Sequence, residues 1–371
     1  MAETNEFMES QVVKDFNKKI EKKSLGPLWN AIPELVSKEP KPLAIPYLWK
    51  WETLRSYLME ATEIFTPERG GERRAIYLQN PGLKDREPWG WGAATQNIYA
   101  AVQLILPGEQ APSHRHTQSA LRFIINGEGA YSVINGERMY MNEGDFVVTP
   151  QGMWHGHGHD GDEPMFWMDV LDIPFIYATG GTFFEGHPEG MEPAVHPDNY
   201  SSKHYQGGLV RPKADRQPKK APVGAYTWKQ TKDALDGMME FEPDAFDGHA
   251  VEFINPSNGK PANANIAAWL QRLPEGYHSS AHRHTNSSIY FVHEGEGYTV
   301  IDGVKFEWAK GDLFIVPSWC WHEHVNTGGK NAHLFSVHDT PIMEHFNLQR
   351  EEEYTDSDGK QYIQDTFQPD E

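Results

Sequence analysis

The first 65 residues have apolar positions three to four residues apart and few helix-breaking residues. This spacing is that of an amphipathic helix and predicts helices over Glu9–Lys22 and Trp51–Ile64. An extended connector is predicted between them, because proline lacks the backbone N–H that a helix needs. The connector contains Pro40, Pro42 and Pro46. We therefore expect an N-terminal helical arm over residues 1–69.

From about residue 70 the pattern changes to short runs rich in β-branched and aromatic residues, separated by Gly, Asn and Asp. Three of these runs, Ala120–Ile125, Ala130–Ile134 and Asp145–Thr149, predict strands. Between two of the strands, Asn135–Gly136 predicts the tight turn of a β-hairpin. The predicted fold class is therefore an all-β core that follows the helical arm.

This β-rich pattern occurs twice. A block of about 50 residues that begins at Pro107 matches a second block that begins at Pro274 in its Gly, Pro and His positions. His114 and His282 differ by 168 positions, and the offset becomes 167 after one deleted residue. Because chance does not easily produce such a match, the sequence predicts two copies of one small β domain.

The remaining segments connect and extend the two copies. We assign residues 70–190 to the first domain and residues 246–346 to the second. Residues 191–245 are rich in Pro and in basic residues and predict an ordered or semi-ordered linker, with a nucleic-acid-binding patch as the less favoured alternative. Residues 347–371 predict a solvated acidic tail, because residues 351–371 contain eight acidic residues and one Lys.

Charge and composition exclude several classes of partner. The 371 residues include 33 Lys and Arg against 53 Asp and Glu, a net charge of −20 that repels nucleic acid. No run approaches the roughly 18 apolar residues of a membrane helix, and the first ten residues lack the layout of a signal peptide. The single cysteine, Cys320, cannot form an intrachain disulfide. We expect a soluble cytoplasmic protein with neither a nucleic-acid nor a membrane partner.

Histidines gather in the two repeated blocks. Eleven of the 18 His lie within residues 114–159 and 278–324, and imidazole is the commonest metal ligand among side chains. In His114-Arg115-His116 the two imidazoles face the same side of a predicted strand, because side chains two apart share a face. A third imidazole, His155, follows another predicted strand. The sequence therefore predicts a three-histidine metal site.

The full spacing resembles the two-motif signature of the cupins. It comprises Gly108-x5-His114-x-His116 and then Gly144-x5-Pro150-x-Gly152-x2-His155. The second copy repeats the pattern and offers a possible second metal site with His282, His284 and His322. Many cupins carry a glutamate ligand four or five residues after the second His, but neither copy has one. A neutral three-histidine set leaves up to three positions open on an octahedral ion, which suits an oxygenase.

The two copies differ beside the histidines. Arg122 of the first copy aligns with Tyr290 of the second, whereas His157 aligns with His324. A forked guanidinium can hold a substrate carboxylate, although a strand Arg paired with a local acid is the alternative interpretation. We therefore assign catalysis to the first copy. The second site is left open between a vestigial or structural metal and a second active centre.

Several segments resemble the bicupin ring-cleaving dioxygenases, the family of gentisate 1,2-dioxygenase and its salicylate- and 1-hydroxy-2-naphthoate-cleaving relatives. The similarity runs from about Leu48 to Phe346. The segments that carry it are Arg69-Gly-Gly-Glu-Arg-Arg74, Asn80-Pro-Gly82, HRHTQSALRF at 114–123, WHGHGH at 154–159, Trp167-Met-Asp169 and Leu171-Asp-Ile-Pro-Phe175. The implied fold is a bicupin of two jelly-roll-like barrels with an N-terminal helical arm.

The resemblance implies a mechanism. Fe(II) held by His114, His116 and His155 would bind a small aromatic hydroxy acid and O2 and cleave the ring between the carboxyl- and hydroxyl-bearing carbons. With gentisate the product would be maleylpyruvate; salicylate and 1-hydroxy-2-naphthoate are the alternative substrates. A metal-binding cupin that is not an oxygenase, whether an isomerase, a hydrolase or a binding protein, is the alternative from another class. The family also implies a homotetramer.

Residue roles follow from the same resemblance. Arg122 and Arg73 would hold the substrate carboxylate, and spacing alone leaves Arg74 open in place of Arg73. His157 would bind substrate or oxygen and move a proton, while Asp169 would orient a neighbouring side chain. The other expected substrate-binding residues are Tyr99, Ala101, Gln103 and Trp167. For Tyr99 and Trp167 a purely structural place in the core is equally favoured, whereas Tyr99 and Ala101 together resemble the gentisate-type members.

Overall fold

The structure is a computed structural model that describes residues 7–66, 73–90, 92–205, 213 and 224–369. The chain divides into two compact units, Met1–Lys41 and Pro42–Glu371. The first unit contains helices α2 (Gln11–Glu21) and α3 (Leu28–Leu35). The rings of Phe16 and Trp29 lie 6.1 Å apart within it. Helix α2 agrees with the helix predicted over Glu9–Lys22.

The predicted boundary of the arm at residue 69 differs from this division. Helix α4 (Trp51–Ile64) has the predicted bounds, but it belongs to the second unit. Strand β1 (Tyr47–Trp49), which precedes it, pairs with β19 (Leu313–Val316) of the second repeated block. Backbone pairing across such a distance in the sequence was not encoded in the local helical pattern.

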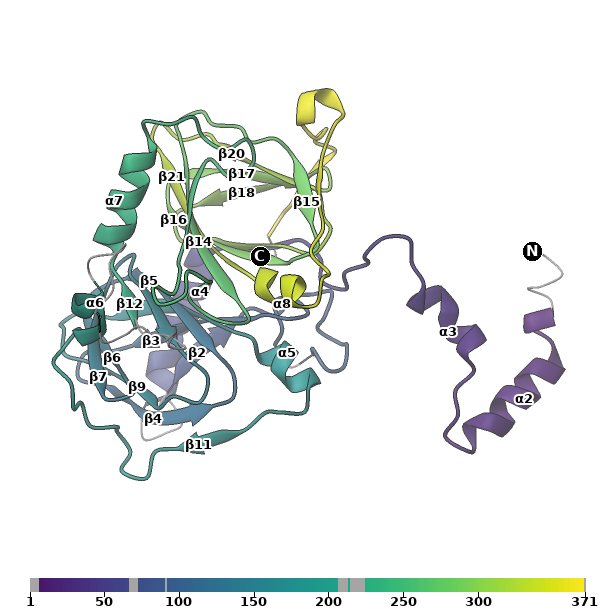
Figure 1. The fold of residues 1–371 in the computed structure, drawn as a ribbon, viewed down its shortest axis with the longest axis horizontal. Coiled ribbons are helices and arrows are strands. Elements are labelled where there is room, and N and C mark those ends of the chain that lie inside the picture. The colour runs from purple at the N-terminus through teal and green to yellow at the C-terminus, as the bar shows by residue number, and fades with distance from the viewer. Residues whose placement is uncertain (1–6, 67–72, 91, 206–212, 214–223, 370–371) are drawn as a thin grey trace. The chain divides into compact units, whose positions relative to one another are not determined.

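The second unit contains two barrels, each built from two facing sheets (Figure 1). In the N-terminal barrel the sheet orders are β12-β8-β5-β10-β3-β2 and β11-β4-β9-β6-β7. Its strands are β2 (Arg74–Tyr77), β3 (Tyr99–Ile105), β4 (Gln110–His116), β5 (Ala120–Asn126), β6 (Glu128–Ile134), β7 (Glu137–Asn142), β8 (Phe146–Thr149), β9 (His155–His159), β10 (Met165–Leu171), β11 (Phe184–Gly186) and β12 (Ala225–Tyr226). Strands β5, β6 and β8 correspond to the three predicted runs. Asn135 and Gly136, with φ of 50° and 78°, form the predicted turn.

The C-terminal barrel repeats this arrangement with orders β1-β19-β16-β21-β14-β13 and β22-β15-β20-β17-β18-β23. Its other strands are β13 (His249–Glu252), β14 (Ala267–Leu273), β15 (His282–His284), β16 (Ser288–Glu294), β17 (Glu296–Ile301), β18 (Val304–Ala309), β20 (His322–Asn326), β21 (Ala332–His338), β22 (Glu351–Glu353) and β23 (Asp365–Thr366). Four further helices are α5 (Ile173–Ala178), α6 (Tyr200–His204), α7 (Trp228–Met238) and α8 (Thr340–His345). A short 3-10 turn spans Ser357–Gly359.

The sheet that contains β5 is buried on both faces, and its two faces have different roles. Leu121, Phe123 and Ile125 belong to the core cluster shared with the C-terminal barrel, where Phe123 stacks on Phe335 at 4.2 Å. Side chains alternate along a strand, so Arg122 and Ile124 face the interior of their own barrel. Burial on both faces explains the nearly continuous apolar run. It also places Arg122 inside the barrel.

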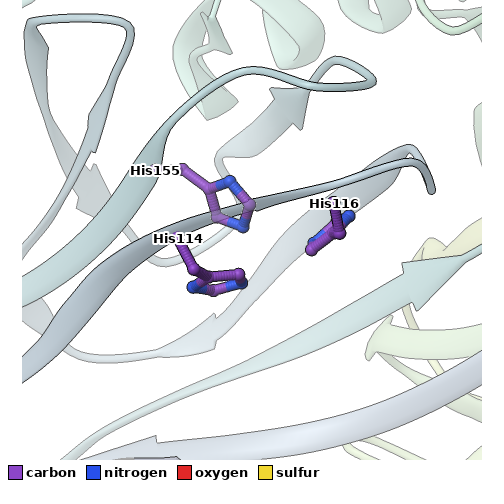
Figure 2. Close-up of side chains that lie close together, drawn as sticks. All are labelled: His114, His116 and His155. Atoms are coloured by element: carbon purple, nitrogen blue, oxygen red, sulfur yellow. The ribbon is translucent and has the colours of Figure 1, made fainter. Parts of the chain in front are cut away.

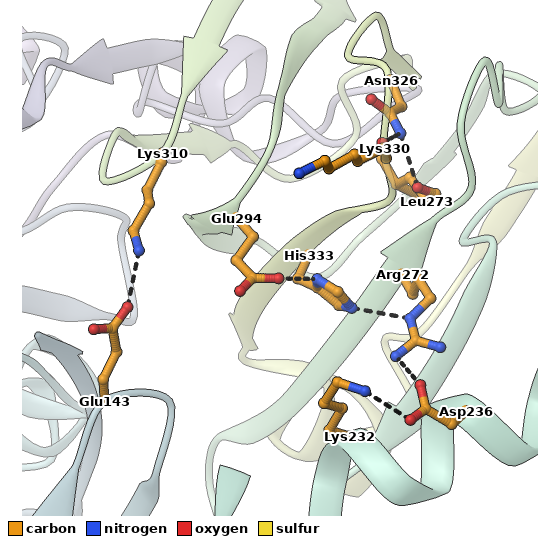
Figure 3. A network of polar contacts seen from close by, with 10 residues as sticks. All are labelled: Glu143, Lys232, Asp236, Arg272, Leu273, Glu294, Lys310, Asn326, Lys330 and His333. Atoms are coloured by element: carbon orange, nitrogen blue, oxygen red, sulfur yellow. Dashed lines mark hydrogen bonds and ion pairs between the residues drawn. The ribbon is translucent and has the colours of Figure 1, made fainter. Parts of the chain in front are cut away.

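The segment predicted as a linker contains helix α7, which docks on the C-terminal barrel (Figure 3). Arg272 of β14 is buried, donates to Asp236 of α7 at 2.7 Å and donates to His333 at 2.9 Å. His333 in turn lies 2.9 Å from Glu294. This chain of contacts fixes the helix to the barrel. Most of the basic residues that raised the nucleic-acid alternative lie outside the described residues.

The acidic C-terminal segment does not fit the prediction of a solvated tail. Strand β22 pairs with β15, and β23 pairs in parallel with β18, so both complete a sheet of the C-terminal barrel. Glu352 of β22 forms an ion pair with Arg283 at 2.6 Å. The acidic run is therefore in part an edge strand whose charge meets a basic partner. Among the described residues, no helix has the length and apolar character needed to cross a membrane.

Candidate metal centre

The first histidine triad is assembled by two neighbouring strands. His114 of β4 lies opposite His155 of β9 in the antiparallel register, and His116 lies two residues further along β4. The candidate ligand atoms of the three side chains lie within 4.8 Å of one another (Figure 2). All three residues are less than 10% exposed. The predicted residues therefore converge on one point inside the N-terminal barrel.

Backbone carbonyls orient the imidazoles. His116 Nδ1 donates to the carbonyl of Gln118 at 2.9 Å, and His155 Nδ1 donates to that of Met153 at 3.0 Å. An imidazole whose Nδ1 carries the proton keeps its Nε2 lone pair for a metal. His114 Nδ1 lies 3.4 Å from the carbonyl of Pro112 and also contacts the guanidinium of Arg73. At least two of the three candidate ligands thus have the tautomer that a metal requires.

The protonation state of the triad also suits a cation. Burial and the neighbouring Arg73 and His116 lower the pKa of His114 to about 3. Burial also lowers the pKa values of His116 and His155 from the ordinary histidine value. Neutral imidazoles are the ligating form, so no proton has to be displaced at neutral pH. The donor set fits a divalent transition metal.

Arg122 and Asp169 form a buried pair on the inner wall of the same barrel. They face each other across β5 and β10, with Arg122 Nη2 2.7 Å from Asp169 Oδ1. Arg122 is 3% exposed, so the pair is almost dry. The alternative interpretation of Arg122, a strand Arg with an acidic partner, is therefore correct as far as the pairing goes. Its Nε, however, has no hydrogen-bond partner among the described residues.

His157 joins this pair through a hydroxyl that the sequence analysis missed. Ser132 Oγ lies 3.0 Å from Arg122 Nη1 and 2.9 Å from His157 Nδ1. His157 is fully buried, and its Nε2 has no partner among the described residues. Burial and then Arg122 lower the pKa of His157 well below the ordinary value. The one available signal was the repeat, which aligns Ser132 with another hydroxyl residue, Thr299.

The two candidate arginines, Arg73 just before β2 and Arg74 at its first position, take different places. Arg73 contacts His114 Nδ1 and donates to the carbonyl of Pro112 at 2.9 Å, so it lies at the triad. Arg74 instead forms an ion pair with Glu109 and donates to the carbonyl of Phe65. Since side chains alternate along a strand, only one of the two can face the barrel interior. Here that residue is Arg73.

The remaining substrate-binding candidates lie on one face of β3 and β10. The register pairs Tyr99, Ala101 and Gln103 of β3 with Leu171, Asp169 and Trp167 of β10. Trp167 is fully buried in the apolar core, and its Nε1 donates to Asp169 at 2.9 Å. Burial, Asp169 and Tyr77 raise the pKa of Tyr99 to about 12, so its phenol stays protonated. Trp167 thus has the structural place that the sequence left open, while it also fixes Asp169.

The C-terminal barrel holds a second triad of the same construction. The candidate ligand atoms of His282, His284 and His322 also lie within 4.8 Å of one another. His284 Nδ1 donates to the carbonyl of Asn286 at 2.8 Å, and His322 Nδ1 donates to that of Cys320 at 3.1 Å. His322 Nε2 is buried without a partner among the described residues. A metal would satisfy that nitrogen.

The walls of the second site are different. Tyr290, in the place of Arg122, is 1% exposed and stacks on Phe314 at 4.7 Å. Ser336 pairs with Tyr290 as Asp169 pairs with Arg122. Gly248 precedes β13 as Arg73 precedes β2. None of these three positions carries a charge. The second site therefore has no counterpart of the ion pair between Arg122 and Asp169, nor of Arg73.

Comparisons with known proteins identify this arrangement. The cupin domain family matches residues 101–171 and 269–338. A gentisate 1,2-dioxygenase of Aquipseudomonas alcaligenes is 38% identical over 91% of this chain and 95% of its own length. The chain belongs to the gentisate and salicylate 1,2-dioxygenase family. The predicted bicupin fold is confirmed.

Two further relatives extend the range of this dioxygenase family. A 5-aminosalicylate 1,2-dioxygenase of Comamonas is 37% identical and covers 93% of this chain and 91% of that protein. The crystal structure of salicylate 1,2-dioxygenase from Pseudoaminobacter salicylatoxidans, described as adducts with gentisate, has a TM-score of 0.86 and 32% identity. That match covers 93% of this chain and 94% of the other. The protein is therefore a ring-cleaving dioxygenase of this family.

Proposed function

We propose that the protein cleaves gentisate with O2 to maleylpyruvate in an Fe(II)-dependent reaction inside the N-terminal barrel. Both oxygen atoms enter the product, and the broken bond joins the carboxyl- and hydroxyl-bearing ring carbons. The observation that carries this proposal is the buried Arg122 in the same barrel as a triad of neutral imidazoles. The C-terminal barrel has the triad without the arginine.

His114, His116 and His155 are the residues that would hold iron. Iron bound there would supply the one-electron chemistry that O2 requires and that redox-inert zinc lacks. The chain itself supplies neutral ligands that backbone carbonyls orient. It also encloses them in an apolar barrel, because residues such as Ile124 and Met141 fill the interior around them. This environment excludes bulk water from the reacting atoms.

Two guanidinium groups and one carboxylate would position the anionic substrate. Asp169 and Ser132 hold the two Nη atoms of Arg122, so its orientation is fixed before substrate arrives. Arg122 Nε and Arg73 are then the groups assigned to the substrate carboxylate. Arg73 adds a second cation at the triad, beside the pair of Arg122 and Asp169. An acidic protein can thus bind an anion through a locally positive pocket.

His157 is the group assigned to proton movement at the substrate. Its Nδ1 is engaged by Ser132 Oγ, whereas its Nε2 is buried and without a partner among the described residues. A neutral imidazole that is held at one nitrogen can accept a proton at the other. This arrangement makes Nε2 the site at which a hydroxyl proton of the substrate would be received.

Gentisate is favoured over the other substrates of the family. Tyr99 presents a protonated phenol on the same strand face as Ala101, whose small side chain leaves room for a single ring. The names of the relatives include gentisate, salicylate and 5-aminosalicylate, all single rings with neighbouring carboxyl and hydroxyl groups. Salicylate and 1-hydroxy-2-naphthoate are the alternative substrates. A cupin that is not an oxygenase would leave the Arg122 network without a role.

Oxygen uptake tests this proposal. Protein reconstituted with Fe(II) should consume O2 fastest with gentisate, and more slowly with salicylate and 1-hydroxy-2-naphthoate. Metal-free protein and protein loaded with Zn(II) are the controls and should consume none. If the Fe(II) protein consumed no O2 with any of the three acids, the proposal would be wrong. A preference for salicylate would move the assignment within the family.

We also propose that the chain works as a cytoplasmic homotetramer. The first unit exposes apolar side chains on both of its helices, among them Val12 at 74% and Leu28 at 61%. Exposed apolar surface of this kind marks association surfaces. Sedimentation equilibrium of the full chain should give four times the 42.2 kDa chain mass. A monomeric mass at micromolar concentration would contradict the proposal.

A further inference from the structure

Two partly buried hydrogen bonds join the barrels in a reciprocal pattern. Asn265 of the C-terminal barrel donates to Asp172 Oδ2 at 2.6 Å, and Asn97 of the N-terminal barrel donates to Asp339 Oδ2 at 2.7 Å. Asn97 and Asn265 differ by 168 positions, and Asp172 and Asp339 differ by 167. The same contact is thus made twice, each time between a donor in one barrel and an acceptor in the other.

Each aspartate also holds the loop that orients a histidine ligand. The second carboxylate oxygen of Asp172 accepts from the backbone N–H of Ser119 at 2.9 Å. The residue before Ser119 is Gln118, whose carbonyl accepts from His116 Nδ1. Three hydrogen bonds and one peptide unit therefore connect Asn265 to His116, a candidate metal ligand of the other barrel.

The second site has the same connection in the opposite direction. Asp339 Oδ1 accepts from the backbone N–H of Ser287 at 2.6 Å, and the neighbouring Asn286 carbonyl accepts from His284 Nδ1. Asn97, at the far end, belongs to the N-terminal barrel. The side chain of each aspartate makes no hydrogen bond that caps the helix it precedes, α5 or α8. Helix capping therefore does not account for the pair.

Burial makes these contacts sensitive to change. Asp172 and Asp339 are both fully buried, and each carboxylate oxygen has one of the described N–H donors. Removing the asparagine donor would leave a buried carboxylate oxygen without a partner, which is costly enough to shift the loop. A shift of the loop carbonyl would rotate the imidazole that it orients.

We propose that Asn265 and Asn97 are positioning residues, each of which sets a metal-binding histidine in the opposite barrel. Asn265 acts on His116 through Asp172, and Asn97 acts on His284 through Asp339. The inference rests on the metal centres of the proposed function and does not depend on the ring-cleavage reaction. Each barrel thereby contributes to the ligand geometry of its partner, although neither triad contains a residue from the other barrel.

Co(II) binding to single-site proteins provides the test. The full chain with His284→Ala retains only the first site, and the full chain with His116→Ala retains only the second. In the first background Asn265→Ala should weaken Co(II) binding, followed by its visible absorption, by about tenfold, the lower end for an outer-shell partner. Asn97→Ala should leave the affinity of that site unchanged. In the second background the two asparagine variants should exchange roles.

The two asparagine variants control for each other, because each removes an equivalent contact between the barrels. If both variants weakened both sites equally, or lowered only the melting temperature, the contacts would be merely structural and the inference would be wrong. Should an alanine variant fail to fold, Asn265→Ser and Asn97→Ser keep a polar side chain at each position. Serine is one bond shorter than asparagine, so its hydroxyl loses the contact with the aspartate and the crossed prediction is the same. Absence of O2 uptake in a protein that binds Co(II) normally would contradict the proposed reaction and leave this inference standing.

Discussion

In both barrels the second histidine of the triad donates to a carbonyl two residues later, and the third donates to one two residues earlier. Both barrels also join a buried histidine to a hydroxyl, with His157 on Ser132 in one and His324 on Thr299 in the other. The barrels differ in the residues that line the site. The N-terminal barrel has Arg122 and Asp169 where the C-terminal barrel has Tyr290 and Ser336. A metal-binding framework can therefore be kept while the means to hold an anion is changed.

The largest expected effect comes from replacing Arg122 by tyrosine, the residue at the equivalent position of the C-terminal barrel. Arg122→Tyr should lower kcat/KM for gentisate at least 100-fold, because about 2.7 kcal/mol of charge-assisted bonding is lost. It should also lower the free energy of unfolding by about 3 kcal/mol, because Asp169 keeps a buried charge without its partner. Steady-state O2 uptake and denaturant unfolding measure the two effects.

The double variant Arg122→Tyr/Asp169→Ser separates these effects. It reproduces the pair found in the C-terminal barrel, so stability should return while activity stays low. Arg122→Lys keeps the charge but loses the fork, and Tyr290→Phe is the matched change in the other barrel, expected to leave turnover intact. If the Lys variant kept the wild-type KM and kcat, the carboxylate role of Arg122 would be excluded.

A smaller effect is expected at Asp247, which is partly buried in the C-terminal barrel. Burial and then Asp244 raise its pKa from 3.8 to about 7. The unfolded chain thus loses this proton near pH 4, whereas the folded chain keeps it until about pH 7. The folded state binds more protons in that range, so this group lowers the free energy of unfolding as pH rises from 4 to 7.

Asp247→Asn should therefore stabilise the metal-free protein more at pH 8 than at pH 5. Its amide can still interact with Gln271, which donates to Asp247 at 2.5 Å. Calorimetric melting temperatures of the variant and the wild-type protein at both pH values measure the difference. An equal change at pH 5 and pH 8 would show that Asp247 does not titrate in this way.

The smallest effects are expected at the arginine between the paired histidines. Arg115 forms an ion pair with Glu185 of β11 at 2.6 Å and lies over Trp154, and Arg283 does the same with Glu352 of β22 and Trp321. Arg115→Ala should cost less than about 1 kcal/mol of stability, because both partners are 39% or more exposed. Arg283→Ala should cost somewhat more, since its side chain is only 13% exposed. The opposite order in denaturant unfolding would contradict this comparison.

The repeat made much of the architecture predictable. Two blocks with Gly, Pro and His at offsets of 168 and then 167 imply two similar barrels. His114, His116 and His155 could be grouped because their spacing follows strand geometry. The choice between Arg73 and Arg74 needed the register of β2, because alternation shows only that the two point in opposite directions. If the register of β2 were shifted by one residue, Arg74 would face the barrel interior in place of Arg73.

Contacts between distant segments were not predictable from local patterns. The acidic run at residues 351–353 predicted a solvated tail, but its strand finds an open sheet edge and a basic partner in Arg283. The amphipathic pattern of Trp51–Ile64 identified the helix but not the unit to which it belongs. Asn97 and Asp172 carried no recognised motif. Only their recurrence at the repeat offset could have drawn attention to them.

The central claim is that the N-terminal barrel performs the reaction. It is tested most directly by O2 uptake with gentisate in two matched variants reconstituted with Fe(II), His116→Ala and His284→Ala. Each removes the equivalent ligand from one triad, so damage to the fold should be similar. The account predicts that His116→Ala consumes no O2. His284→Ala should keep at least about half of the wild-type rate, because it leaves every residue of the first site in place. An active His116→Ala protein and an inactive His284→Ala protein would contradict it.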